Sequence, residues 1–361
     1  MTRIIFAGGG TAGHIEPALA VARQWKKIHP DTQILFLGTS AGLENRLVPD
    51  AGFTLALITK VRISRKLSPS LLLTPFSLLR SVVQSYSILK GADLLVGFGG
   101  YVSAPAYLAA KSLGISFVVH EANARPGFAN RLGARLSPYS AISQPVQSGA
   151  LQKALVTGIP LREDVASALV ESAGDWTGAR ARAKSALGFS STDPLVLAFF
   201  GSQGSVALNQ VIAQSLPSLL ANGSQLLHAV GKLNALPPMQ ERYKSTAYIQ
   251  DMATAYLAAD LIISRSGAIS CSEVNALGKY ALFIPLPIGN GEQRFNANSL
   301  VSQGRAEVIQ QNQFTSAWLR SNINRLLNLA VSSADTGSDT DSLATEKIVN
   351  YMQYALKSQV R

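Results

Sequence analysis

Short apolar runs alternate with amphipathic stretches in the first half of the chain. The apolar runs lie at residues 4–7, 34–37, 55–58, 94–96 and 117–119. Helical patterns separate them at residues 17–28, 69–90 and 104–112. Short continuous apolar runs are typical of strands that are buried on both faces. Strand and helix in strict alternation therefore predict a parallel, doubly wound α/β sheet.

The same alternation restarts in the second half. After a hinge pattern at residues 157–160, further apolar runs follow at residues 195–200, 226–230, 261–264 and 281–285. The first run of each half leads into glycines and then into a helical pattern. This repeated pattern predicts two Rossmann-like domains in tandem, over residues 1–160 and 161–341. A helical pattern within residues 342–361 is expected to pack back on the first domain.

Composition narrows the class of protein. The 361 residues include a single cysteine, Cys271, which excludes a disulfide framework and a cysteine-cluster metal site and favours a reducing compartment. No run reaches the roughly 18 apolar residues of a membrane-spanning helix. Residues 1–160 hold 16 Lys and Arg against 6 Asp and Glu, so they carry almost all of the net charge of +11. This asymmetry indicates a polyanion or an anionic lipid surface as a partner, or a basic face that only aids solubility.

A glycine loop follows the first predicted strand. Residues 8–13 read Gly-Gly-Gly-Thr-Ala-Gly, which matches the G-x-G-x-x-G pattern of phosphate-binding loops. The second predicted strand ends without the Asp or Glu that would hold a ribose in a dinucleotide fold, which counts against NAD or FAD. His14 comes directly after the loop, in the first turn that follows it. We take it as the candidate catalytic base, with a hydrogen bond to the backbone as the alternative role.

Other polar residues follow predicted strands, where open α/β sheets bind ligands. Glycine turns lie at residues 97–101 and 201–204, and His120-Glu121-Ala122-Asn123 follows the run at 117–119. The latter is not a zinc motif, because no second His follows at helical spacing. After the run at 261–264, a turn of small residues opens a helix that carries Glu273. Such a helix N-terminus suits a diphosphate, and Glu273 suits the hydroxyls of a ribose, although a surface glutamate is the alternative.

Six motifs occur in order along nearly the whole chain. They are Gly9-Gly10-Thr11-Ala12-Gly13-His14, Gly99-Gly100-Tyr101-Val102-Ser103, His120-Glu121-x-Asn123, Gly201-Ser202-Gln203-Gly204, Arg265-Ser266-Gly267-Ala268 and Glu292-Gln293-Arg294-Phe295-Asn296-Ala297. Together they resemble the MurG family of glucosaminyltransferases, which convert lipid I to lipid II in peptidoglycan synthesis. The resemblance implies a GT-B fold of two Rossmann-like doubly wound domains facing a cleft. It places the donor nucleotide in the C-terminal domain and the lipid-linked acceptor in the N-terminal one.

The resemblance also implies site residues. The donor, UDP-GlcNAc, is expected to contact Thr11, Ala12, Gly13, Asn123, Arg162, Ser202, Ile249, Ala268, Ile269, Ser270, Cys271, Ser272, Glu273 and Gln293. The acceptor side is expected to include Gly10, Tyr101, Glu121 and Asn130, besides His14. Ala12 and Ala122 depart from the family pattern, where Gly and Gln are common.

The expected reaction moves GlcNAc from UDP-GlcNAc to the C4 hydroxyl of MurNAc in undecaprenyl-diphospho-MurNAc-pentapeptide, with inversion from α to β. Inversion needs one base at the acceptor hydroxyl, which is assigned to His14. We expect no metal and no cofactor, because the one Asp-x-Asp, at residues 339–341, lies in a polar segment without a strand before it. The implied partners are lipid I, an anionic inner-leaflet surface, and cell-wall and division machinery proteins, and no nucleic acid is expected.

Two other functions remain open. The first is another GT-B enzyme, either a lipid glycosyltransferase or a UDP-GlcNAc epimerase. The second is an oxidoreductase that binds NAD or FAD at the first glycine loop, which the missing acid disfavours.

The helical pattern at residues 69–90 carries more apolar positions than one buried face needs. Two neighbouring apolar stripes together span about 160°, against roughly 100° for a one-sided surface helix. A basic cluster directly precedes them. Either a neighbouring helix covers the second apolar stripe, or the stripe and the basic cluster bind the cytoplasmic face of the cell membrane peripherally. The residues assigned to this contact are Arg62, Arg65, Lys66, Leu71, Leu78 and Val82.

Overall fold

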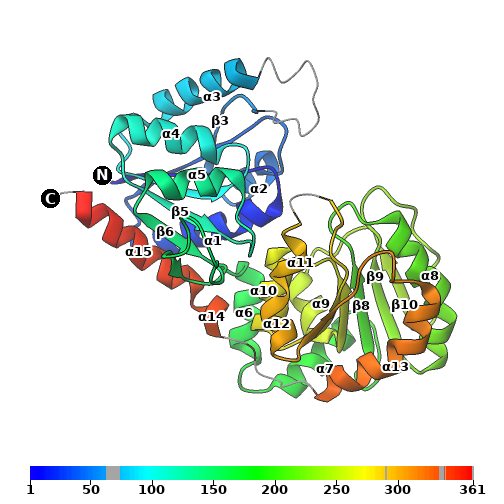
Figure 1. Cartoon of the computed structure of the whole chain (residues 1–361). Helices are drawn as coiled ribbons and strands as arrows, with labels where there is room; N and C mark the ends of the chain where they lie inside the picture. The colour runs from blue at the N-terminus through cyan, green and yellow to red at the C-terminus, as the bar shows by residue number, and fades with distance from the viewer. Residues whose placement is uncertain (62–73, 289–290, 333–336, 338, 360–361) are drawn as a thin grey trace. The chain divides into compact units, whose positions relative to one another are not determined.

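The computed structural model describes residues 1–61, 74–288, 291–332, 337 and 339–359 (Figure 1). The chain divides into two compact units. Unit 1 comprises Met1–Arg162 and Thr340–Arg361, and unit 2 comprises Glu163–Asp339. Each unit is built on its own parallel sheet with helices on both faces. The prediction of two Rossmann-like doubly wound domains is therefore confirmed.

Unit 1 has a seven-stranded sheet in the order β3-β2-β1-β4-β5-β6-β7. Its strands are β1 Arg3–Gly8, β2 Gln33–Gly38, β3 Thr54–Leu57, β4 Leu94–Gly99, β5 Phe117–Glu121, β6 Tyr139–Ile142 and β7 Leu155–Val156. Its helices are α1 Ala12–Ile28, α2 Glu44–Asp50, α3 Thr74–Leu89, α4 Ser103–Leu113, α5 Phe128–Leu136 and α15 Ala344–Gln359. The short helix α14, Asp339–Ser342, spans the return of the chain from unit 2 to unit 1.

The central strands of unit 1 are apolar on both faces because helices cover both. Side chains alternate between the faces of a strand. Phe6 accordingly lies in a core with Trp25 of α1 and Met352 of α15, whereas its neighbour Ile5 lies in a second core with Tyr107 of α4. The terminal helix α15 thus packs on α1 and completes one of the two cores.

Unit 2 repeats this plan with a six-stranded sheet in the order β10-β9-β8-β11-β12-β13. Its strands are β8 Leu195–Phe199, β9 Gln225–Ala229, β10 Tyr243–Thr246, β11 Leu261–Ser264, β12 Tyr280–Phe283 and β13 Ala306–Val308. Its helices are α6 Glu163–Ser172, α7 Trp176–Ala186, α8 Val206–Ala221, α9 Met252–Ala258, α10 Ala268–Ala276, α11 Gln293–Asn296, α12 Asn298–Ser302 and α13 Ser316–Ser332. Here too, alternate residues of β8 enter two different cores.

The strand order reverses once in each sheet. In unit 1 the reversal lies between β1 and β4, and in unit 2 it lies between β8 and β11. Open α/β sheets bind ligands outside the carboxyl ends of the strands at such a point. The glycine turns that follow these four strands therefore mark the candidate sites.

The first helix begins earlier than the sequence pattern predicts. We expected it at residue 17, but α1 begins at Ala12 and contains Pro17. Pro17 is the sixth residue of α1, so its missing N–H removes one hydrogen bond within the helix, and α1 nevertheless continues through it. The earlier start brings His14 into the first turn of α1.

Candidate active site

His14 is held by the loop that precedes it. Its Nδ1 lies 3.1 Å from the Gly9 carbonyl oxygen and 3.2 Å from Thr11 Oγ1. A carbonyl oxygen only accepts, so Nδ1 carries the proton in that contact and Nε2 keeps a lone pair. Nε2 faces Gly99 at the end of β4, where a Cβ would lie 3.3 Å from it. The ring can therefore accept a proton at Nε2 while Nδ1 anchors it.

The surroundings of His14 keep the ring in its basic form near neutral pH. Burial is the main cause and lowers the pKa of His14 below its ordinary value of 6.5. Three other interactions raise the pKa of His14, but together they are weaker than the effect of burial. They are the charge of Glu121, the hydrogen bond to the Gly9 carbonyl and the charge of Glu44. A neutral imidazole at working pH is what a general base requires.

The buried Glu121 at the end of β5 organises its neighbours. Its Oε1 accepts hydrogen bonds from the backbone N–H and the side-chain amide of Asn123, at 2.9 and 3.1 Å. Its Oε2 accepts from Gly127 N and from Asn130 Nδ2, at 2.9 and 3.1 Å. Asn130 is fixed further by the Tyr107 hydroxyl, which donates to Asn130 Oδ1 at 2.9 Å. With four hydrogen bonds, the Glu121 carboxylate orients Asn123 and Asn130 rather than acting as a base.

His120, the other histidine of this segment, has a different environment. It is fully buried, and its Nε2 donates to the Gly158 carbonyl oxygen at 2.9 Å. Burial lowers the pKa of His120 to about 4. The ring is therefore neutral and turned toward the backbone, which leaves His14 as the histidine beside the glycine turns of unit 1.

Tyr101 lies over the glycine loop on the surface of unit 1. The ring is exposed, and a Cβ on Gly10 would lie 3.4 Å from it. Gly10 has a φ of +91°, which favours glycine. The Lys60 ammonium lies 4.9 Å from the centre of the Tyr101 ring. An aromatic face and a cation therefore lie beside the loop, a combination that the sequence analysis found only in part.

In unit 2, the turn after β8 packs closely on the segment after β9. Gly201 and Gly204 have φ values of +87° and +73°, and a Cβ on Gly204 would overlap the Val230 carbonyl oxygen. The exposed Ser202 accepts a hydrogen bond from Lys232 N at its carbonyl oxygen, at 3.1 Å. These contacts fix the turn against its neighbour while leaving the Ser202 side chain accessible.

The turn after β11 carries the start of α10. The Arg265 guanidinium donates to the carbonyl oxygens of Ile284 and Pro285, both at 3.1 Å, and to Gln311 Oε1 at 2.7 Å. Arg265 therefore ties this turn to the next strand. Gly267 stands at the N-cap position of α10 and has no side chain that could cap the helix. Its first N–H groups can accordingly take an anion.

The candidate donor residues of α10 fall into two groups. Ala268, Ile269 and Ser270 in the first turn are half-buried. The next three positions are buried, and the Cys271 side chain belongs to the core of unit 2. Glu273 is 1% exposed, so it lies inside the fold and not on the helix surface.

The remaining candidates divide between the units. The Ile249 side chain lies in the core of unit 2. Gln293 accepts from Leu286 N at Oε1, at 3.0 Å, and its carbonyl oxygen accepts from Ser266 Oγ at 2.7 Å. Arg162 ends the Met1–Arg162 segment of unit 1, and this segment also holds the candidates Thr11, Ala12, Gly13 and Asn123.

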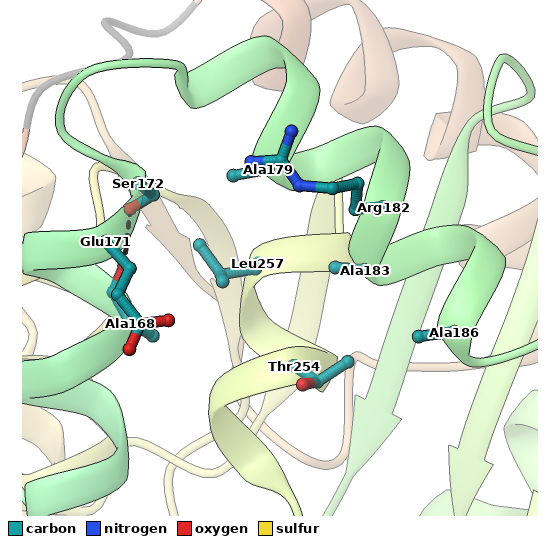
Figure 2. A pocket seen from close by; sticks show the side chains of 9 residues that line it. All are labelled: Ala168, Glu171, Ser172, Ala179, Arg182, Ala183, Ala186, Thr254 and Leu257. Atoms are coloured by element: carbon teal, nitrogen blue, oxygen red, sulfur yellow. Dashed lines mark hydrogen bonds between the residues drawn. The ribbon is translucent and has the colours of Figure 1, made fainter.

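Within the described ranges, the acidic side chains and the pocket of Figure 2 add no further candidate. Across residues 1–61 and the later described ranges, no group of three or more His, Cys, Asp or Glu side chains could hold a metal ion. Asp341 of the Asp-x-Asp instead accepts a hydrogen bond from Ile159 N at 2.8 Å. The pocket in Figure 2 lies among α6, α7 and α9 and contains none of the candidate residues. It is lined by Ala168, Glu171, Ser172, Ala179, Arg182, Ala183, Ala186, Thr254 and Leu257.

Helix α3 exposes a different apolar stripe from the one that we assigned to the membrane. Leu78 and Val82 are half-buried, and Val82 packs against the core of unit 1. The exposed side carries Phe76 (72% exposed) with Leu79, Val83 and Tyr86. The assigned residues Arg62, Arg65, Lys66 and Leu71 lie outside the described residues. None of the described helices has the length and hydropathy that a membrane crossing needs.

Family models match both units. The glycosyltransferase family 28 N-terminal domain matches residues 4–138, and the glycosyltransferase family 28 C-terminal domain matches residues 195–350. The matched ranges contain the glycine turns of both sheets, together with His14 and Glu273.

Curated relatives match nearly from end to end. The chain is 42% identical over 355 residues to a Streptomyces coelicolor protein, covering 94% of this chain and 95% of that protein. It is 43% identical over 350 residues to a Corynebacterium glutamicum (strain R) protein, covering 96% and 95%. Both relatives carry the name UDP-N-acetylglucosamine–N-acetylmuramyl-(pentapeptide) pyrophosphoryl-undecaprenol N-acetylglucosamine transferase.

A solved structure agrees with these relatives. The crystal structure of Acinetobacter baumannii MurG superposes with a TM-score of 0.74 at 28% identity. The match covers 98% of this chain and 100% of that one.

Proposed function

Because the chain belongs to glycosyltransferase family 28, and within it to the MurG transferases, we propose that it converts lipid I to lipid II. The reaction moves GlcNAc from UDP-GlcNAc to the C4 hydroxyl of MurNAc in undecaprenyl-diphospho-MurNAc-pentapeptide. The observation that carries this proposal is the identity of 42% across both units to a transferase of that name. Partners among cell-wall and division proteins belong to the same proposal, which the family resemblance supports.

In the proposed mechanism, His14 removes the proton of the acceptor hydroxyl as that oxygen attacks the anomeric carbon of the donor. The anchored Nδ1 and the unprotonated Nε2 of His14 support this role. A single displacement inverts the α linkage of the donor to β. The acceptor contacts proposed for Gly10 and Tyr101 are supported by their position at the glycine loop that holds His14.

The donor is proposed to bind at unit 2. The uncapped N-terminus of α10 and the turn after β8 would stabilise the negative charge that develops on the leaving UDP. Glu273 is proposed to accept hydrogen bonds from the ribose hydroxyls. Backbone groups at Ile249 and at residues 271–272, whose side chains are buried, are proposed to make further donor contacts.

Product analysis tests the proposed function. The protein is incubated with radiolabelled UDP-GlcNAc and a lipid I analogue, and the lipid fraction is analysed by chromatography and mass spectrometry. We expect label in a lipid that is heavier than the analogue by one GlcNAc residue. Conversion of UDP-GlcNAc to its C2 epimer, with no label in lipid, would instead support the epimerase.

Chelation should leave the activity nearly intact. We propose that backbone N–H groups and the helix N-terminus take the role that a divalent cation has in metal-dependent transferases. In the transfer assay, excess EDTA is expected to preserve most of the initial rate. Complete loss that added Mn²⁺ or Mg²⁺ restores would contradict this mechanism.

We also propose reversible binding to the cytoplasmic face of the cell membrane through α3 and the basic segment before it. The exposed stripe of Phe76, Leu79, Val83 and Tyr86 supports insertion into the interface, in place of the stripe predicted from sequence. Arg62, Arg65 and Lys66 would add about 1 kcal/mol each near an anionic surface.

Vesicle co-sedimentation measures this binding. Binding should require anionic lipid and weaken as salt rises. It should fall severalfold in Phe76→Ser/Leu79→Ser and in Arg62→Glu/Arg65→Glu/Lys66→Glu. Val170→Ser, which changes an exposed apolar residue of unit 2, is the control and should bind like the wild type. Equal binding of all these proteins to neutral vesicles would refute the proposal.

A further inference from the structure

A carboxylate that the sequence analysis did not single out lies beside the glycine loop of unit 1. Glu44, the first residue of α2, is fully buried. Its Oε2 accepts a hydrogen bond from Gly10 N at 2.9 Å. Its Oε1 accepts from Thr39 N at 2.9 Å and from Thr39 Oγ1 at 3.1 Å. Glu44 therefore ties the end of β2 to the loop that follows β1.

Three glycines make room for this carboxylate. A Cβ on Gly38 would lie 2.6 Å from Glu44 Cγ, and a Cβ on Gly9 would lie 3.1 Å from Oε1. A Cβ on Gly42 would overlap the carboxylate itself. Since Gly9 follows β1 while Gly38 ends β2 and Gly42 lies between β2 and α2, the fold brings separate segments together around a side chain of this size and shape.

Glu44 and His14 bind the two sides of one peptide group. The Gly10 N–H, which donates to Glu44, and the Gly9 carbonyl, which accepts from His14 Nδ1, belong to the same peptide bond. In a planar trans peptide these two groups point in opposite directions. A carboxylate on the N–H polarises the peptide, and hydrogen bonds in such a chain strengthen one another. The Gly9 carbonyl therefore becomes a stronger acceptor for the imidazole N–H.

We propose that Glu44 is a positioning residue for the transfer reaction: through the Gly9–Gly10 peptide it orients the His14 ring with Nε2 toward the acceptor. This inference rests on the proposed function of His14 as the base. It assigns to Glu44 the task that a carboxylate in direct contact with a catalytic histidine has in other enzymes, with a peptide bond in between. Glu44 itself touches neither substrate.

The same arrangement separates this loop from a dinucleotide-binding loop. One backbone N–H of the loop is already taken by a negative charge, which opposes a diphosphate at Gly10. The end of β2 carries no acid, and the first acid after it, Glu44, lies six residues later and folds back onto the loop.

Two carboxylates act on the His14 ring from the elements around it. Glu121 lies on β5 and Glu44 on α2, and both raise the pKa of His14. β4 contributes Gly99, which has no side chain, and α5 contributes the neutral Asn130. Removal of the Glu44 charge is therefore expected to lower the pKa of His14 further. The acid limb of the activity, where His14 gains a proton, should then move to lower pH.

Two substitutions distinguish the effect of the Glu44 charge from the effect of the length of its side chain. Glu44→Gln keeps the length of the side chain, but it removes the charge and leaves one of the two backbone N–H groups facing an NH₂. Glu44→Asp keeps the charge, but it is one methylene too short to hold both Gly10 and Thr39. Asp50→Asn removes an exposed carboxylate from the same helix and is the matched control.

Imidazole titration by NMR, with His14 assigned from the signal missing in His14→Gln, tests the proposal without any substrate. The pKa of His14 should fall in Glu44→Gln and stay at the wild-type value in Asp50→Asn. In the transfer assay, kcat should fall about ten- to a hundredfold in both Glu44 variants, because small displacements of a catalytic group have effects of this size. The donor KM should stay within about twofold.

An unchanged or raised His14 pKa in Glu44→Gln would overturn the proposal, as would a kcat equal to that of Asp50→Asn. A measurement on the wild type does not depend on how the variants fold: its neutral His14 should carry the proton on Nδ1 in a long-range ¹H–¹⁵N spectrum, and an Nε2–H tautomer would overturn the proposal. A different result would contradict only the proposed function: the wild type would make no lipid II, while the pKa of His14 would still fall in Glu44→Gln.

Discussion

Replacement of His14 by Ala should lower kcat by about 10²- to 10⁴-fold, which is the usual contribution of a general base. The variant should still bind UDP-GlcNAc with an affinity within about twofold of the wild type. The acid limb of the pH profile should disappear with the imidazole. In the wild type, this limb should lie below pH 6.5, because burial lowers the pKa of His14 and the ring stays neutral to more acidic pH. Steady-state kinetics from pH 5 to 9 and calorimetric titration with donor provide these measurements.

His29→Ala is the matched control. His29 follows α1, the helix that begins beside the glycine loop, and its ring contacts Trp25 and Gln353 instead of the loop. It should leave kcat and the pH profile unchanged. If His14→Ala keeps more than a tenth of the wild-type kcat, another group must take the proton.

Replacement of Glu273 by Ala should raise the donor KM about ten- to a hundredfold, with kcat much less affected. Hydrogen bonds to a charged group contribute about 1.5–3 kcal/mol, and a ribose contact is made equally in the ground and transition states. The initial rate as a function of UDP-GlcNAc concentration measures this effect.

Glu273 is buried, so its replacement by Ala can also disturb packing, and a second variant that preserves packing is needed. Glu273→Gln should melt close to the wild type and still raise the donor KM, by less than the Ala variant. Glu241→Ala, an exposed carboxylate of the same unit, should change nothing. An unchanged donor KM in a folded Glu273→Ala protein would remove Glu273 from the donor site.

The alternation of apolar runs predicted strands β1 to β5, β8, β9, β11 and β12, because strands that are buried on both faces leave a strong pattern. Ile4, Val96 and Val196 illustrate this, since each lies at the centre of its sheet and is fully buried. The alternation did not predict the short strands β6, β7, β10 and β13, which lie at or next to the edges of the sheets. The glycine turns were equally visible, because positive φ values such as those of Gly10 and Gly201 favour glycine.

Side-chain direction was much harder to predict. Cys271 and Ile249 lie within segments expected to contact the donor, yet their side chains pack in the core of unit 2. On α3, both apolar stripes looked alike in sequence. Only the packing of Val82 and Leu89 against unit 1 shows that the stripe of Phe76 and Leu79 is the exposed one.

Glu44 was not predicted from the sequence, for a related reason. Helix α2 has only seven residues, which are too few to show a recognisable helical period. In a dinucleotide-binding fold, moreover, the acid is expected directly at the end of β2, and Glu44 does not lie there. The glycines at positions 9, 38 and 42 carried the signal, but their common neighbour becomes evident only in three dimensions.

The configuration of the new glycosidic bond tests the account most directly. Lipid II analogue made from UDP-GlcNAc can be isolated and its anomeric proton examined by NMR, with the linkage position read from long-range couplings. A single displacement assisted by His14 predicts a β linkage to C4 of MurNAc, with the large H1–H2 coupling of two axial protons. An α-linked product would contradict the account, because retention needs a second displacement that this site is not proposed to perform.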